Sequence, residues 1–366
     1  MKISGRSLGI LLEWTLILII AFAFAIRTSP VQTYLAQKAA AYLSAELGTT
    51  VKIDKVAIIF FDEVALDGFL MLDQQGDSLF AAETIFATVD QIRLSDNYYK
   101  IGKLQLDGGY GHIQKNSTGE INLKFLKDYF TSDKKKKKRT LEFAITSIEL
   151  NDAHFIYDDH RKTPTTFGVD YYHLDADNIN GTIDGISILN KDIKATITNL
   201  TASDKSGFKL KNLSTSANLS GDGVFLSNLH LTTDKSKINA PKFNLVTSSY
   251  SDFYHFIDSV NFDAKISKSQ VSMEDVALFG TALEGMDETI TLKTNISKKV
   301  NDLKLSELDI RIREKTCIQG TLNLIDFKEF ESASLSEELD SVYIDIAELE
   351  KIKLPKSASS DFLVLD

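Results

Sequence analysis

The sequence predicts a mostly β protein in which an N-terminal transmembrane helix and an amphipathic helix precede a long antiparallel β-sheet. Three observations predict this fold class. An apolar run near the N-terminus is long enough to cross a bilayer, the next stretch has apolar residues at helical spacing, and most of the remaining chain alternates apolar with polar residues. With 366 residues, 43% of them hydrophobic, the chain is long enough to bury a sizeable core.

The apolar run extends from Leu8 to Ile26, and its roughly 19 residues span most of a hydrocarbon core about 30 Å thick. Lys2 and Arg6 precede the run, which favours a cytoplasmic N-terminus and places the bulk of the chain across the membrane. A cleaved signal peptide is the alternative, because Ala23–Ala25 has the A-x-A pattern of a cleavage site. The residues expected to anchor the chain are Leu8, Ile10, Leu12, Trp14, Leu16, Leu18, Ile20, Phe22, Phe24 and Ile26.

A second helix is expected at residues 30–48, where apolar residues recur at helical spacing. Pro30 suits the first turn of a helix, and Gly48 suits its end. The apolar stripe consists of Val31, Leu35, Ala39, Tyr42, Leu43 and Leu47. We expect this stripe to cap one end of the sheet. The alternative is contact with the outer surface of the membrane that the chain spans.

Beyond Gly48 the chain reads as short strands separated by turns rich in Asp, Asn and Gly, the pattern of antiparallel strands with one buried face. A helix is expected at Ile121–Phe130, before six consecutive basic residues, Lys134–Arg139. This basic loop is expected to be solvated, with contact to anionic lipid as the alternative. The predicted segments are residues 1–29 (cytoplasmic stub and transmembrane helix), 30–48 (amphipathic capping helix), 49–130 (first β segment), 131–140 (basic loop) and 141–366 (second, extended β segment).

Three details of the second β segment carry expectations. A three-residue step between Ile145 and Ile148 predicts a bulge or corner near Ser147, and the apolar spacing predicts a strand at Val169–Ala176. The dipeptide Asn-Leu recurs as a weak, unevenly spaced repeat. Its three copies begin at Asn199, Asn212 and Asn228.

No catalytic, cofactor-binding or metal-binding residues are predicted. The six histidines form no His-Glu-x-x-His motif, and no P-loop or nucleophile elbow is present. Asp158, Asp159 and His160 are expected to form a polar turn rather than a metal site. Cys317 is the only cysteine, which excludes a disulfide within the chain and a multi-thiolate zinc site. The net charge of −10 argues against nucleic-acid binding, and an enzymatic function has no support.

The order of segments resembles the N-terminal part of the TamB and AsmA-like family, in particular the TamB-type translocation and assembly module components of Bacteroidetes-like bacteria. The resemblance rests on the single N-terminal span and on the degenerate stretches Ala41–Gly48, Val51–Val56, Val64–Asp73, Leu104–Asp107, Gly119–Leu123, Ser206–Leu210 and Met273–Phe279. Members of this family are usually far longer and end in a C-terminal domain that this sequence does not show. We therefore expect the chain to be truncated at its C-terminus.

The resemblance implies an elongated, curled antiparallel sheet that forms an open β-trough with an apolar inside. It also implies a single-pass protein of the bacterial inner membrane with its bulk in the periplasm. Such a protein carries phospholipid between the inner and outer membranes, supports the assembly and secretion of outer-membrane proteins, or does both, together with an outer-membrane TamA-like partner. The alternative is a membrane-tethered β scaffold that binds protein partners without carrying lipid.

Inward positions of the regular strands are the candidates for lipid contact, although each would serve equally well in a closed core. Burying one acyl CH₂ against such side chains gains about 0.8 kcal/mol, so a row of them carries lipid tails without any catalytic group. The candidates are Phe143, Ile145, Val169, Ile197, Phe208, Leu210, Leu226 and Phe243.

Overall fold

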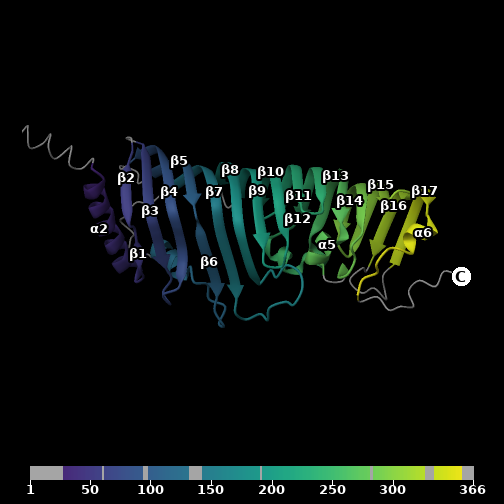
Figure 1. Ribbon diagram of the computed structural model, residues 1–366, viewed down its shortest axis with the longest axis horizontal. Helices are drawn as coiled ribbons and strands as arrows, with labels where there is room; N and C mark the ends of the chain where they lie inside the picture. Colours follow the sequence, from purple (N-terminus) through teal and green to yellow (C-terminus); the bar gives the residue numbers. More distant parts are fainter. Residues whose placement is uncertain are drawn as a thin grey trace, which may run out of the picture. The chain divides into compact units, whose positions relative to one another are not determined.

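The structure is a computed structural model, and it describes residues 28–59, 62–93, 98–131, 142–189, 192–280, 283–325 and 334–356. The predicted anchor, from Leu8 to Ile26, and the basic run Lys134–Arg139 lie outside these residues. Within the described ranges, no helix combines the length and the hydropathy needed to cross a bilayer. The described chain is mostly β, as predicted, and it divides between Ile145 and Thr146 into two compact units (Figure 1).

The N-terminal unit combines two helices with antiparallel strands. Strand β3 pairs with both β1 and β2 along one edge and with β4 along the other, and β4 also pairs with β5 and β6. The predicted helix at Ile121–Phe130 is present but begins three residues later. The elements are α2 (Ser29–Leu47), β1 (Val51–Lys52), β2 (Lys55–Ile58), β3 (Glu63–Leu72), β4 (Ser78–Arg93), β5 (Tyr98–Asp107), β6 (Tyr110–Lys115) and α3 (Lys124–Thr131).

Helix α2 covers the edge of the sheet formed by β1 and β2, and it does so with polar side chains. The backbone N–H of Val56 donates to Thr33 Oγ1 at 3.0 Å, and that of Ile58 donates to Gln32 Oε1 at 2.9 Å. The backbone N–H of Val51 donates to Ser44 Oγ at 2.8 Å. Because an edge strand exposes N–H and C=O groups that need partners, these side chains replace a neighbouring strand.

The predicted orientation of this helix is only partly right, because Leu47 of the predicted stripe is buried and Leu43 packs against the core. Leu35 and Tyr42, two members of the predicted apolar stripe, are 52% and 63% exposed. The inward face carries Gln32, Ala40 and Leu47, which are buried. The physical reason is that much of this face meets a strand edge, where hydrogen-bonding side chains satisfy the backbone and a purely apolar stripe would leave it unpaired.

The C-terminal unit is an antiparallel meander in which each strand from β8 to β17 pairs with the next (Figure 1). Its elements are β7 (Glu142–Asp159, which begins before the division), β8 (His173–Leu189), β9 (Asp192–Asp204), β10 (Lys209–Ser220), β11 (Gly223–Thr233), β12 (Lys237–Val246), η2 (Tyr250–His255), α4 (Phe256–Ser259), β13 (Asn261–Ser272), α5 (Met273–Phe279), β14 (Thr289–Lys299), β15 (Asp302–Ile312), β16 (Thr316–Ile325), β17 (Ser334–Tyr343) and α6 (Ile346–Leu349).

A line of irregular positions crosses the strands of this sheet. Non-glycine residues with positive φ interrupt five strands, and register shifts of the pairing occur beside them. They are Asp152 (φ 54°), Asn178 (51°), Asn199 (51°), Asn228 (53°) and Glu307 (49°). β-Bulges bend and twist a sheet, so a line of them makes this sheet curve about the line.

Side chains on neighbouring strands replace the hydrogen bonds lost at these bulges. Asn180 Oδ1 accepts the backbone N–H of Asp152 at 2.8 Å. Ser214 Oγ accepts the N–H of Asn199 at 3.0 Å. Buried Thr294 donates its hydroxyl to the carbonyl of Ser306, next to Glu307, at 3.1 Å. These bonds fix where each strand bends.

The line explains part of the Asn-Leu repeat and bears on the predicted bulge. Asn199 and Asn228 adopt the left-handed conformation, which Asn tolerates, whereas Asn212 does not, although a register shift lies beside it. The pairing of β7 with β8 is regular from Ser147 to Leu150. A register shift lies further along the strand, at Asp152, and the spacing of Ile145 and Ile148 does not indicate it.

Candidate functional site

The strand registers of the C-terminal unit produce one face that is apolar across eight strands. Residues paired directly opposite each other in an antiparallel sheet point to the same face. One continuous row of such pairs runs from β9 to β16 and consists of Ala195, Ala217, Leu226, Phe243, Ala264, Ile296, Leu305 and Leu322. We call the face that carries this row the apolar face.

A second row lies two residues away on the same strands and widens the apolar face. It contains Ile193, Leu219, Val224, Leu245, Phe262, Leu303 and Leu324, with Lys298 between Phe262 and Leu303. Phe243 and Phe262 make an edge-to-face contact with ring centroids 6.0 Å apart. Phe256 of α4 packs against Phe262 in the same geometry at 6.0 Å. The apolar face therefore continues into α4 at one rim of the sheet.

The opposite face of these strands is polar. Its matching row, offset by one residue, consists of Ser216, Ser227, Lys242, Lys265, Asn295 and Ser306. Lys242 and Lys265 face each other across β12 and β13, and Lys242 Nζ lies 2.6 Å from the Asp263 carboxylate. One face is thus suited to water and the other is not.

Burial along the apolar face follows the bulge line. The buried core consists of Leu229, Ala240, Ala264 and Ile266, which lie at or close to that line. The larger side chains around them, including Leu226, Phe243 and Ile296, are only partly buried. All of the described strands belong to a single sheet. The larger side chains beside the bulge line therefore stay partly accessible on the apolar face.

The structure brings four of the eight predicted lipid-contact residues onto the apolar face. Ile197 lies opposite Ile183 and Thr215, and Leu210 lies opposite Ala202 and Thr233. Leu226 and Phe243 face each other directly across β11 and β12.

The other four predicted residues are placed elsewhere. Val169 is not in a strand, since it lies in the loop after β7 and donates its N–H to the Leu278 carbonyl at 2.7 Å. Phe208 precedes β10 and packs edge-to-face on Phe279 at 4.9 Å. Alternation places Ile145 on the face opposite Ile148, and the side chain of Phe143 lies outside the described residues.

Sequence reasoning missed the part of the apolar face on β14 to β16. Ile296, Leu305 and Leu322 continue the row directly from Ala264. The signal was present, because the strands containing them alternate apolar and polar residues as clearly as β11 does. Only the register, which joins residues far apart in the chain, shows that they extend the same row.

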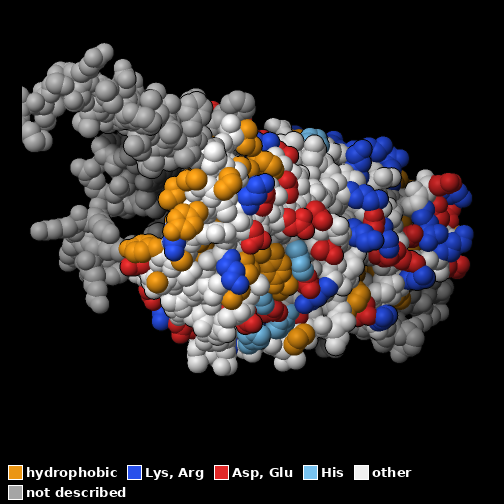
Figure 2. All heavy atoms as spheres, turned by 60° about the vertical axis from the view of Figure 1, so that its left-hand side comes forward, with side chains coloured by type: hydrophobic (Ala, Val, Ile, Leu, Met, Phe, Trp, Pro, Cys, Tyr) orange, Lys and Arg blue, Asp and Glu red, His pale blue; other side chains and the backbone are white. Residues whose placement is uncertain are grey.

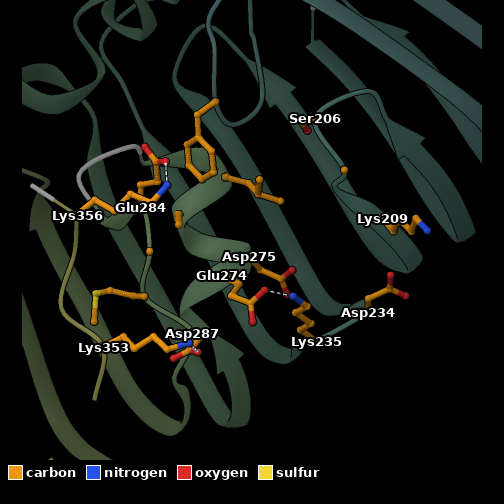
Figure 3. Close-up of a pocket in the computed structure, with 16 residues that line it drawn as sticks. Ser206, Lys209, Asp234, Lys235, Glu274, Asp275, Glu284, Asp287, Lys353 and Lys356 are labelled. Atoms are coloured by element: carbon orange, nitrogen blue, oxygen red, sulfur yellow. Dashed lines mark hydrogen bonds and ion pairs between the residues drawn. The ribbon is translucent and has the colours of Figure 1, made fainter. Parts of the chain in front are cut away.

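A pocket of about 560 Å³ lies beside α5 at the other rim of this sheet (Figure 3). Its wall carries charges of both signs, and they neutralise one another. Lys235 pairs with Glu274, Lys353 with Asp287, and Lys356 with Glu284. The Asp275 carboxylate accepts the hydroxyls of Thr233 and Ser236. These contacts join α5 to the turn between β11 and β12, and they join the segment between α5 and β14 to the segment after α6.

The loop between β7 and β8 packs on α5 and contains a buried polar network. The Asp170 carboxylate accepts the backbone N–H groups of Thr165, Tyr172 and His173 at 2.8 to 3.2 Å. Burial alone would raise the pKa of Asp170, but these bonds and nearby His173 outweigh it and lower the pKa. The predicted polar turn at Asp158–His160 is joined to this network of hydrogen bonds through Asp158 and Asp159.

His173 occupies the centre of this network. Its Nδ1 lies 3.1 Å from Asp158 Oδ1, and its Nε2 lies 3.0 Å from the Lys162 carbonyl. Two acceptors suit an imidazolium, in which both nitrogens donate. Burial alone would lower the pKa of His173, but the bonds to Asp158 and Lys162 and the charges of Asp170 and Asp158 outweigh it, so the pKa is raised above 6.5.

We expect the stability of this loop to depend on pH through His173. Because the folded state holds the proton more tightly than the unfolded state does, the stabilisation is complete below the ordinary pKa and is lost as the pH rises through the raised value. Intrinsic-rate-corrected hydrogen exchange of residues 160–172 should show weaker protection at about pH 8.5 than at about pH 6. The His173→Gln variant should lose this pH dependence, whereas His255→Gln should keep it.

Among the described residues, no group of three or more His, Cys, Asp or Glu side chains is arranged to hold a metal ion. The candidate functional site is instead the apolar face, whose large side chains are only partly buried.

Comparison with known proteins gives no further identification. No protein-family model, no curated protein and no solved structure matches this chain. The resemblance to the TamB and AsmA-like family therefore stays a prediction from the sequence.

Proposed function

We propose that this chain is a membrane-anchored envelope-biogenesis protein that carries phospholipid, with the acyl chains lying against the apolar face. The proposal includes the localisation expected from the sequence, a single span in the bacterial inner membrane and a periplasmic bulk. Support for the assembly and secretion of outer-membrane proteins, with a TamA-like partner, is the other part of the proposed role.

The observation that carries the proposal is the apolar face across β9 to β16. Its large side chains, such as Phe243 and Ile296, are only partly buried, although the polar face behind them already meets water. Apolar side chains that stay partly accessible to water gain free energy when a ligand or partner covers them. An acyl chain laid along the bulge line would gain about 0.8 kcal/mol for each buried CH₂.

The arrangement also suits movement of the ligand along the sheet. Neighbouring strands lie about 4.8 Å apart, so equivalent apolar positions recur at short steps across the meander. Contacts of this kind have no preferred direction or geometry, because hydrophobic burial depends on area. An acyl chain bound in this way can shift from one strand to the next without breaking a specific bond.

Photocrosslinking of the full chain in its membrane tests the proposal. A benzoylphenylalanine placed at Leu226 or Ile296 inserts into nearby C–H bonds, and the adduct is identified by mass spectrometry. The matched controls are Ser227 and Asn295, which are the next or preceding residues on the polar face. We expect phospholipid adducts from the two apolar positions and not from the two controls.

Two other outcomes would argue against lipid carriage. Protein adducts alone at Leu226 and Ile296 would support the tethered scaffold. Equal phospholipid yields at all four positions would show nonspecific contact with the membrane.

A further inference from the structure

The outward face of α2 carries large apolar side chains that are exposed. Tyr34, Leu35 and Tyr42 are 59%, 52% and 63% exposed. Their spacing of seven and eight residues places them on one face of the helix. Lys38 lies on the same face, with its ammonium 5.5 Å from the centre of the Tyr34 ring.

The inward face already accounts for the packing of α2 in its unit. Gln32, Thr33 and Ser44 bind the backbone of β1 and β2, and Ala40 and Leu47 join the core. The outward side chains take no part in these contacts. Figure 2 turns this side of the molecule towards the viewer and shows hydrophobic side chains at its surface.

The apolar surface extends to the strand that α2 covers. Ile58 and Ile59 are 46% and 50% exposed, and the Ile58 N–H is bonded to Gln32 in the first turns of the helix. Tyr34, Leu35, Ile58 and Ile59 thus place exposed apolar side chains near the beginning of α2, and Tyr42 continues the outward face towards its end.

The sequence before α2 indicates what lies next to this surface. The apolar run from Leu8 to Ile26 ends three residues before the helix begins at Ser29. If that run crosses a bilayer, the first turns of α2 must lie near the lipid–water boundary. Tyrosine is favoured at this boundary, and a lysine can extend its ammonium to the headgroups. The single acidic residue of α2, Glu46, lies at its far end.

We propose that α2 is an interfacial helix whose outward face lies on the surface of a phospholipid bilayer. This inference rests on the membrane anchoring in the proposed function, but not on lipid carriage by the apolar face. Because the inward face is bonded to β1 and β2, the same helix would hold the first strands of the N-terminal unit at the membrane surface. One helix then serves as both the edge cover of the sheet and its membrane contact.

Spin labels on the full chain in phospholipid nanodiscs test this inference. Cys317 is replaced by serine, and single cysteines are introduced as Leu35→Cys, Tyr42→Cys and, as the solvent control, Gln74→Cys in the exposed turn after β3. Oxygen concentrates in lipid and a nickel chelate in water, so their relaxation effects report the surroundings of each label. We expect a several-fold higher oxygen-to-nickel ratio at positions 35 and 42 than at position 74.

Three results would overturn the inference, and each has a different meaning. A high nickel effect at 35 and 42 would show that the face is in water. Low effects of both reagents would show that protein, such as the segment before Ser29, covers it. A chain that does not enter nanodiscs would refute the membrane anchoring itself. The first two results leave the expected crosslinking yields at Leu226 and Ile296 unchanged, whereas the third would also contradict the membrane anchoring in the proposed function.

Discussion

Replacing Leu79 by alanine is expected to destabilise the N-terminal unit by about 2–5 kcal/mol. Leu79 is completely buried at the start of β4. It belongs to a cluster with Ala40 and Leu47 of α2 and with Phe125 of α3. Truncation removes the buried methyl groups and leaves a cavity between elements that cannot easily close in. The effect should reach both helices, because the partly buried residues packed against this cluster include Leu43 of α2 and Leu126 of α3.

Hydrogen exchange measured by mass spectrometry on the full chain is the suitable measurement, since it resolves the two units. Peptides from α2 and α3 should lose protection in Leu79→Ala. The matched control is Phe86→Ala on the same strand, because Phe86 is 39% exposed and its truncation should cost much less. Loss of protection throughout the C-terminal unit as well would contradict the separate cores seen here, as would equal effects of the two variants.

The period-two pattern of the sequence was sufficient to predict a mostly β chain and the inward side of several strands. Leu226 and Phe243 were placed correctly on one face because each lies in a regular stretch. Alternation fails where a backbone turns left-handed. Regular alternation across Asn228 would place Leu226 and Leu229 on opposite faces. Instead Leu229 is buried and Leu226 packs against the same cluster, because the backbone is left-handed at Asn228. The bulge is set by pairing with distant strands.

Three other errors have the same physical origin. Helical spacing identified an apolar stripe on α2 but not which side would meet the sheet, because the edge of β2 required hydrogen bonds. Val169 has strand-like neighbours, yet its N–H is taken by the Leu278 carbonyl of α5. Helix α5 itself spans only seven residues, too short for its periodicity to be recognised. In each case a tertiary contact outweighed the local preference.

The second large effect is expected on the apolar face. Replacing both Phe243 and Leu305 by aspartate should reduce phospholipid adducts from a benzoylphenylalanine at Ile296 by at least about tenfold. The two residues lie in the same row, and Leu305 is directly opposite Ile296. A carboxylate at these positions is hydrated. Binding of an acyl chain would remove that water, and the desolvation costs at least about 2 kcal/mol. A difference of about 1.4 kcal/mol already changes occupancy tenfold.

The control for this variant carries the same added charge on the other face. Ser227→Asp with Asn295→Asp places two carboxylates beside Lys242 and Lys265, where they meet water and opposite charge. Adduct yields should stay close to those of the unaltered chain. Phe243→Asn with Leu305→Asn, which changes polarity without charge, should give an intermediate loss.

Full adduct yield from the aspartate variant, with unchanged hydrogen exchange of β11 to β15, would mean that lipid does not lie on this face. The exposed rows would then be a surface for protein partners, because burial against another polypeptide is the remaining way to remove so much apolar area from water.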